Sequence, residues 1–230
     1  MWVAGVDGCG NGWVVALRHV KTGELRLLST HRLETIFSLD EKPMRMVVDM
    51  PMGLSAENSK VGRQCEAEAR ALLKEKARSV FSTPSREALY ASTYRQAVDR
   101  NVNRAGISPP AVKIMLKIRE VDSIVTPDIQ DRFIEGHPEL AFYLLNDNAP
   151  VMSRKSTPEG ELERLELLKK SGINVQADWL DDRVIGAERN DIVDAIVLTR
   201  TAERHLNGNA ICLPNKPIAD NRGLKMAIWY

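Results

Sequence analysis

The sequence opens with the β-prone run Trp2-Val-Ala-Gly-Val-Asp7, which ends in an acid. Three glycines between residues 8 and 12 indicate a tight turn, after which Trp13-Val-Val-Ala-Leu17 resumes an apolar strand. Lys21-Thr-Gly-Glu24 is typical of a hairpin turn and predicts a third strand from Leu25 to Thr30. Because turns this short leave no room for a helix, the three strands should form an antiparallel meander.

Downstream of this meander the chain alternates between helical and strand patterns. A fourth strand is expected over Met44–Asp49 and a fifth over Asp131–Glu135. Helices are expected over residues 33–39, most of 57–122, from Pro138 onward, 156–171 and 191–205, whereas residues 210–230 have a loop-like composition. A meander that continues into α/β units is the arrangement of the ribonuclease-H-like fold, a mixed sheet flanked by helices. We therefore expect a single α/β domain over residues 1–230, with a mostly helical insertion over residues 53–130.

The composition favours an ordinary globular protein. No apolar run approaches the roughly 20 residues that cross a bilayer, and no leader-like segment opens the chain, so we expect no membrane partner. The 3 cysteines are widely spaced and no CxxC occurs, which argues against a disulfide framework or a zinc site and predicts a cytoplasmic protein. Residues 53–130 carry 13 Lys and Arg against 9 Asp and Glu, which suits either a nucleic-acid groove or a solvated helix surface. The oligomeric state, including a homo-oligomer, stays open.

Two acids stand at the ends of strands that the ribonuclease-H-like topology places side by side. Asp7 ends the first strand and Asp49 ends the fourth, so the two carboxylates should come close together. Like charges stay ionised together only where a positive charge lies between them. A divalent cation with oxygen ligands is the natural choice, and Mg²⁺ or Mn²⁺ suits carboxylates best. Either acid by itself could instead be a strand-end turn residue.

A second pair of acids opens the last long helix, in Asn190-Asp191-Ile-Val-Asp194. The spacing of three puts Asp191 and Asp194 on one helix face. Acids near a helix N-terminus also favour the helix macrodipole, with Asn190 as the cap, and this interpretation explains Asp191 well. It explains Asp194 less well, because an apolar stretch begins at Ala195. Asp194 should therefore lie at the edge of the core and face the sheet.

Four further side chains are candidates for the same site. Glu135 ends the fifth strand and could supply a metal ligand, and His137 just beyond it could contact a substrate or only start a helix. Arg63 and Arg86 lie in the basic insertion and could bind a phosphate. The alternative is that these arginines pair with nearby acids and hold the insertion together.

Seven motifs follow one another along the chain. They are Gly5-Val-Asp-Gly-Cys-Gly-Asn-Gly-Trp13, Val48-Asp-Met-Pro-Met-Gly53, Arg63-Gln-Cys65 with Ser79-Val-Phe81, Glu135-Gly-His-Pro-Glu139, Lys155-Ser, Asp191-Ile-Val-Asp-Ala195 and Arg222-Gly-Leu-Lys-Met-Ala-Ile-Trp229. As an ordered set they resemble the domain-of-unknown-function family four-two-nine, described as predicted ribonuclease-H-like nucleases, over the whole chain. The Asp pair of the last helix also resembles that of the RuvC-type Holliday-junction resolvases. One departure is Asn190, where the family frequently has an additional Asp.

Metal-dependent phosphodiester hydrolysis of nucleic acid, with DNA and RNA both open, is the leading hypothesis for the function. Two cations about 3.5–4 Å apart would orient a water and neutralise the leaving oxygen. Asp7 would bridge both metals, Asp49 and Asp194 would each hold one, and Asp191 or Glu135 would complete a shell.

Two other classes of function are alternatives. An ATP-dependent phosphotransferase of the actin and sugar-kinase class shares this core, and Asp7-Gly-Cys-Gly10 resembles its first phosphate loop. Such proteins need a second copy of the core, for which 230 residues are too few. A binding module that keeps the fold without the chemistry is weakened by the retention of every carboxylate in the set. Binding of ATP would favour the phosphotransferase, and a lack of divalent-metal binding would favour the binding module.

Overall fold

The computed structural model describes residues 1–56, 60, 62–180 and 186–230, which form two compact units. Unit 1 comprises Met1–Asp49, Arg132–Ile211 and Trp229–Tyr230, and unit 2 comprises Met50–Asp131 and Cys212–Ile228. The expected insertion over residues 53–130 falls within unit 2. Unit 2 also takes in residues 212–228, which the sequence pattern does not assign to it.

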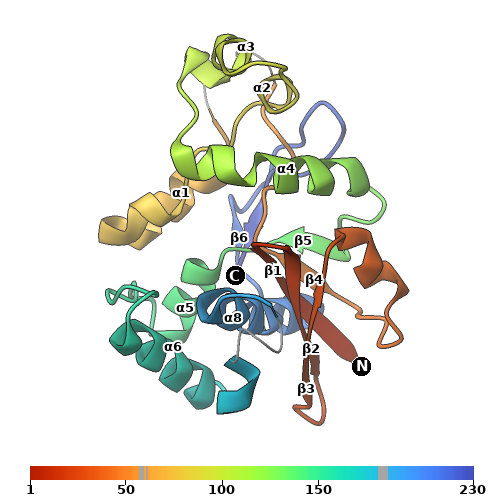
Figure 1. Cartoon of the computed structure of the whole chain (residues 1–230), viewed down its shortest axis with the longest axis vertical. Coiled ribbons are helices and arrows are strands. Elements are labelled where there is room, and N and C mark those ends of the chain that lie inside the picture. The colour runs from red at the N-terminus through yellow and green to blue at the C-terminus, as the bar shows by residue number, and fades with distance from the viewer. Residues whose placement is uncertain (57–59, 61, 181–185) are drawn as a thin grey trace. The chain divides into compact units, whose positions relative to one another are not determined.

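Unit 1 contains a five-stranded mixed sheet with the order β3-β2-β1-β4-β5. β1 (Trp2–Cys9) pairs antiparallel with β2 (Gly12–His19), which pairs antiparallel with β3 (Leu25–Thr30). β4 (Met46–Val48) is parallel to β1, and β5 (Phe133–Glu135) is parallel to β4. The predicted meander and the adjacency of the first and fourth strands are confirmed. So is the mixed sheet flanked by helices, and the arrangement agrees with a ribonuclease-H-like fold (Figure 1).

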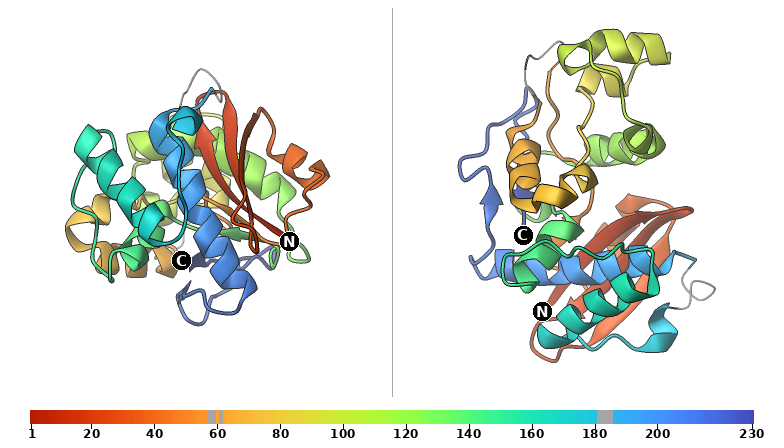
Figure 2. Two further views of the ribbon diagram at one scale, coloured as in Figure 1. Left: turned by 90° about the horizontal axis from the view of Figure 1, so that it is seen from below. Right: turned by 90° about the vertical axis from the view of Figure 1, so that its left-hand side faces the viewer.

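The longer helices of unit 1 lie on one side of this sheet (Figures 1 and 2). α8 (Arg189–Leu206) packs on β1 and β2, and α5 (Pro138–Leu145) and α6 (Pro158–Lys170) pack beside α8. Gly5 marks the closest approach of strand and helix, because a Cβ there would lie 2.0 Å from the carbonyl oxygen of Ala195. Only glycine lets the central strand and this helix meet so closely.

Strand register assigns each side chain to one face of the sheet. Val47 is the partner of Gly5 in β1 and of Ile134 in β5, so all three positions face α8. The side chains of Val47 and Ile134 accordingly share one core with buried residues of α8. Phe133 lies on the opposite face and contacts Phe37 of the short 3₁₀ helix η1 (Leu33–Ser38). A further short helix of unit 1, η4, spans Ala177–Leu180.

Unit 2 is mostly helical, as the sequence predicts for most of residues 57–122. Its elements are α1 (Gln64–Leu73), η2 (Lys74–Ser79), α2 (Arg86–Leu89), α3 (Tyr94–Arg100), η3 (Val102–Arg104) and α4 (Pro109–Ile124). The hydroxyls of Ser85, Thr93 and Ser108 cap α2, α3 and α4, which explains where these helices begin. A small apolar cluster includes Ala88 and Ala97.

The C-terminal segment differs from the loop expected over residues 210–230. β6 (Cys212–Leu213) and β7 (Ile228–Trp229) form a separate two-stranded sheet. Gln130 fixes part of the segment within unit 2, because its amide group donates to the carbonyl of Lys225 and accepts from the N–H of the same residue. Such long-range contacts leave no trace in local sequence periodicity. Among the described residues, no helix combines the length and apolar character needed to cross a membrane.

Candidate functional site

Asp7 and Asp49 occupy neighbouring positions at the ends of the parallel strands β1 and β4. Val6 is the register partner of Val48, and the Asp49 N–H donates to the carbonyl oxygen of Val6 at 2.9 Å. Asp7 therefore lies beside Asp49 on the sheet face that α8 covers. Asp7 is 7% exposed, and its Oδ1 accepts a hydrogen bond from the Gly8 N–H at 2.7 Å.

α8 carries Asp191 and Asp194 one turn apart. Asp194 is buried, which confirms that it lies at the edge of the core, whereas Asp191 is half-buried. The expectation that Asn190 caps this helix is wrong. The helix begins two residues earlier than its apolar pattern suggests, so Glu188 is the N-cap residue and Asn190 lies inside the first turn. The Asn190 amide instead donates to Oδ1 of Asp191 at 2.9 Å.

The carboxyl groups of these four aspartates interact with one another. Burial and then the charges of Asp49 and Asp194 raise the pKa of Asp7 well above its usual value. Burial and the charge of Asp194 raise the pKa of Asp49 to about 7. Burial likewise raises the pKa of Asp191, to about 6, and the pKa of Asp194. The structure therefore brings Asp7, Asp49, Asp191 and Asp194 together in one carboxylate cluster, in which ionisation of each acid opposes that of the others. Asp7 and Asp194 are buried, and Asp49 and Asp191 are half-buried.

Lys155 provides a positive charge inside this carboxylate cluster. Its Nζ donates to Oδ2 of Asp194 at 2.7 Å. Burial opposes the charged ammonium, but Asp194, Asp7 and Asp49 together raise the pKa of Lys155 above its ordinary value. The side chain of Lys155 is 44% exposed and that of Asp194 is 3% exposed, so the ammonium group lies between a buried carboxylate and solvent. The sequence motif Lys155-Ser contains this residue but gives no indication of its role.

A tight turn before α6 holds Lys155 in this position. Thr157 caps the helix by accepting a hydrogen bond from the Gly160 N–H, and its hydroxyl donates to the carbonyl oxygen of Arg154 at 3.0 Å. A Cβ on Gly160 would lie 1.9 Å from that same carbonyl oxygen. The turn therefore packs directly against the first turn of α6, and its place depends on the absence of a side chain at Gly160.

A buried ion pair between Glu139 and Arg164 lies next to the carboxylate cluster. Arg164 is 1% exposed, and its Nη2 donates to Oε1 of Glu139 at 2.8 Å. After burial and Lys155, the charges of Glu139 and Arg164 have the next largest effects on the pKa of Asp194. Glu139 lies in the first turn of α5. The local sequence indicates only that it is an acid at the start of a helix. Both residues are thus part of the site's electrostatics.

Removal of the Lys155 charge tests whether this ammonium stabilises the cluster. We expect Lys155→Met to lower the free energy of unfolding by about 1–2 kcal/mol at pH 8, less than for a fully buried pair because Lys155 is partly exposed. At pH 5 the loss should be smaller, because Asp49 and Asp191, with pKa values of about 7 and about 6, are then largely protonated and the cluster carries less negative charge. Urea unfolding at the two pH values measures both quantities. Lys21→Met, at an exposed turn of the same unit, is the control. An equal loss at pH 5 and pH 8 would contradict this role.

The structure does not bring Glu135 to the carboxylate cluster. Glu135 is the register partner of Val48, so its side chain is on the sheet face opposite to Asp49 and α8. It is buried there, 5% exposed. His137 is the N-cap residue of α5, and its carbonyl oxygen accepts the N–H of Ala141, which fits the helix-start alternative. A contact of His137 with a substrate stays a prediction.

Arg63 and Arg86 both make ion pairs within unit 2. Arg63 is 2% exposed, pairs with Glu66 at 3.2 Å and donates to the carbonyl oxygen of Met52. Arg86 pairs with Asp122 at 2.9 Å and with Asp220 at 2.6 Å. These contacts favour the alternative in which the arginines hold unit 2 together. Contacts of either residue with a phosphate stay a prediction.

The side chains of the carboxylate cluster fit a hard divalent cation in kind. All four aspartates offer oxygen atoms, which Mg²⁺ and Mn²⁺ prefer. Their pKa values are raised first by burial and then by neighbouring acids, and a bound cation would offset both effects. Among the residues that the structure describes, no group of three or more His, Cys, Asp and Glu side chains has the arrangement of a ready-made metal site. In the structure, the Lys155 ammonium supplies the positive charge.

The chain belongs to the family described as Protein of unknown function (DUF429), whose model matches residues 5–219. The match spans the strands that carry Asp7 and Asp49, the turn with Lys155 and the helix with Asp194. Neither the curated proteins nor the solved structures contain a significant match to the chain.

Proposed function

We propose that this protein is a divalent-metal-dependent nuclease that hydrolyses phosphodiester bonds in DNA or RNA. The observation that carries the proposal is the convergence of Asp7, Asp49 and Asp194, from two strand ends and one helix, in one carboxylate cluster. Burial of several mutually repelling carboxylates costs stability, and a cluster with no ligand would gain nothing in return. A binding site for hard cations would explain why several carboxylates are placed together despite this cost.

The four aspartates would have different roles in such a site. Asp7, Asp49 and Asp194 would hold Mg²⁺ or Mn²⁺, which supplies Lewis-acid activation of water and neutralises phosphate charge when bound. Oδ1 of Asp7 already accepts a hydrogen bond from the Gly8 N–H, which fixes the direction of its carboxylate. Asp191, half-buried and with its pKa raised to about 6, is suited to accept a proton from an attacking water near neutral pH.

Lys155 and the pair of Glu139 with Arg164 complete the proposed machinery. The Lys155 ammonium is exposed enough to approach a phosphate oxygen of the substrate while it remains bonded to Asp194. Arg164 is enclosed and orients Glu139 beside the cluster, so it acts on the electrostatics rather than on the substrate. None of the 3 cysteines forms a disulfide in the described part of the chain, which suits the cytoplasmic location that we propose together with this activity.

Metal titration followed by a cleavage screen tests this proposal. We expect Mn²⁺ or Mg²⁺ to raise the melting temperature, by about 5–11 °C at about 100 times the dissociation constant. Single-stranded, branched, duplex and hybrid substrates are then incubated with the metal-loaded protein. Asp7→Asn should raise the stability of the metal-free protein because one repelling charge disappears. The same substitution should also abolish both the thermal shift and any cleavage.

Asp40→Asn is the matched control, because Asp40 is an exposed acid of the same unit outside the cluster. It should keep the metal-dependent thermal shift and the cleavage activity. An Asp7→Asn protein that gains as much stability from Mn²⁺ as the wild type would count against Asp7 as a ligand. Metal binding without cleavage of any nucleic acid would overturn the proposed activity.

A further inference from the structure

Unit 2 contains a cavity of about 1170 Å³. Among the described residues, its walls come from residues 54–56 and 62–83, residues 101–110 and the C-terminal stretch 214–226 of this unit. Sites for small organic ligands usually measure about 300–1,000 Å³, so this cavity has room for much more than an inorganic ion.

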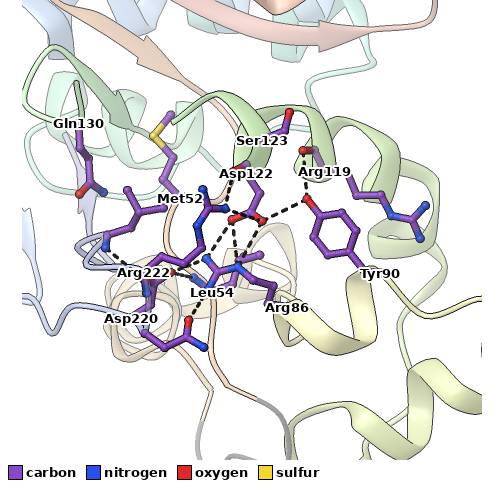
Figure 3. A network of polar contacts seen from close by, with 12 residues as sticks. Met52, Leu54, Arg86, Tyr90, Arg119, Asp122, Ser123, Gln130, Asp220 and Arg222 are labelled. Carbon is purple, nitrogen blue, oxygen red and sulfur yellow. Dashed lines mark hydrogen bonds and ion pairs between the residues drawn. The ribbon is translucent and has the colours of Figure 1, made fainter. Parts of the chain in front are cut away.

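The charged side chains of the lining leave an excess of positive charge. The two acids are Glu66 and Asp220, and both are already neutralised. Glu66 pairs with the buried Arg63 at 3.2 Å and with Arg70 at 3.3 Å, so one acid faces two arginines. Asp220 accepts hydrogen bonds from Arg86 and from the Leu54 N–H (Figure 3). Burial alone would raise the pKa of Asp220, but these contacts hold it below its usual value.

Arg70 and Arg78 supply the remaining charge of the cavity wall. Arg70 is held in place because its Nε donates to the carbonyl oxygen of Val80 at 2.9 Å and its Nη2 donates to the Ser82 hydroxyl at 2.9 Å. The same Nη2 also pairs with Glu66 at 3.3 Å, an acid that Arg70 shares with Arg63. Arg78 is exposed and makes no hydrogen bond or ion pair with another residue of the described chain. Guanidinium groups suit phosphate because two of their N–H groups can bind two of its oxygens at once.

In the sequence, Phe81 lies between Val80 and Ser82, and Arg70 donates a hydrogen bond to each of these two neighbours. Its ring is half-buried, packs on the small apolar cluster with Ala88 and Ala97, and also lines the cavity. The rest of the wall includes apolar side chains such as Val102, Ile218 and Met226. One wall thus combines an aromatic ring with arginines, which is the pairing that binds a nucleobase by stacking and its phosphate by charge.

We propose that this cavity binds a nucleoside 5′-phosphate, with the phosphate on Arg70 and Arg78 and the base against Phe81. An inorganic phosphate would leave the apolar walls without a partner, and a purely apolar ligand would remove the arginines from water without compensation. The ligand is either a free mononucleotide or the phosphorylated end of a strand, because both present the same groups. This site does not depend on the carboxylate cluster of unit 1.

Isothermal titration with the full chain in EDTA tests the proposal, using AMP, GMP, CMP and UMP, with adenosine and inorganic phosphate as partial ligands. At least one mononucleotide should bind at least tenfold more tightly than either partial ligand. Binding should persist in Asp7→Asn, so failure of this site and failure of the proposed nuclease remain distinguishable. Oligonucleotides with and without a 5′-phosphate separate the two sources of the ligand. Tighter binding of the phosphorylated strand than of the mononucleotide identifies a strand end.

Arg78→Ala should weaken binding of the mononucleotide at least tenfold and leave adenosine binding unchanged. Because Arg78 has no partner in the described chain, this variant should fold normally. Arg95→Ala removes an exposed arginine of the same unit that does not line the cavity, and it should have no effect. Phe81→Leu should weaken the mononucleotide and adenosine alike, about tenfold. The proposal is overturned if no mononucleotide binds, or if Arg78→Ala and Arg95→Ala behave alike.

Discussion

Gly5→Ala should abolish the stable fold, with a loss of more than about 4 kcal/mol in the free energy of unfolding. The added Cβ would lie 2.0 Å from the carbonyl oxygen of Ala195 and 2.8 Å from the Cβ of Leu198. Neither β1 nor α8 can move aside, because both are buried at the centre of unit 1. Circular dichroism and urea unfolding of the purified variant would measure the effect.

Gly10→Ala is the matched control for this prediction. Gly10 follows the same strand, yet a Cβ there would meet no atom within 4 Å. Its backbone is not in the left-handed region that favours glycine, so alanine should be accepted with little change in stability. If both variants unfold at the same urea concentration as the wild type, the close packing of β1 on α8 is not what the structure indicates.

The stability of the metal-free protein should fall as the pH rises from about 4 to about 7. An acid whose pKa is higher in the folded chain than in the unfolded chain binds more protons when folded, so deprotonation favours unfolding. Asp49, with its pKa raised to about 7, and Asp191, with its pKa raised to about 6, set this window. At 1.36 kcal/mol per pKa unit, Asp49 alone accounts for a loss of about 2–4 kcal/mol between pH 4 and pH 8.

Urea unfolding in EDTA at pH 5, 6, 7 and 8 measures this pH dependence. Asp49→Asn should flatten it, because the asparagine amide does not titrate, whereas Asp40→Asn should leave it unchanged. Saturating Mn²⁺ should also flatten the profile in the wild type by compensating the carboxylate charges. Stability that stays constant or rises from pH 5 to pH 8 in EDTA would mean that burial and neighbouring charges do not raise the pKa values of these aspartates as the structure indicates.

The strand pattern was sufficient to predict the neighbourhood of Asp7 and Asp49. Both acids end strands with clear apolar periodicity, and the tight turns of the meander fix which strands lie side by side. Asp194 followed from a local contrast, a carboxylate next to the apolar run that starts at Ala195. Such features depend on short segments, and the periodicity of a single chain reports them well.

The sequence could not assign a face to Glu135 or a role to Lys155. A strand places alternate side chains on opposite faces, so a one-residue uncertainty in register decides whether Glu135 points to Asp49 or away from it. Lys155 reaches Asp194 across 39 positions of the chain. It does so through a turn whose place depends on a close contact at Gly160, and neither lysine nor glycine is unusual in a surface turn.

The contacts of Asp220 also determine when unit 2 can finish folding during synthesis of the chain. Arg86 leaves the ribosome 134 residues before Asp220, and the N–H of Leu54 leaves 166 residues before it. At translation rates of about 5–20 residues per second, Arg86 waits about 7–27 s for this carboxylate. Residues 50–131 are therefore all exposed to the cell before the acid that joins them exists. Unit 2 can therefore reach its final fold only after Asp220, and after it Lys225, has left the ribosome.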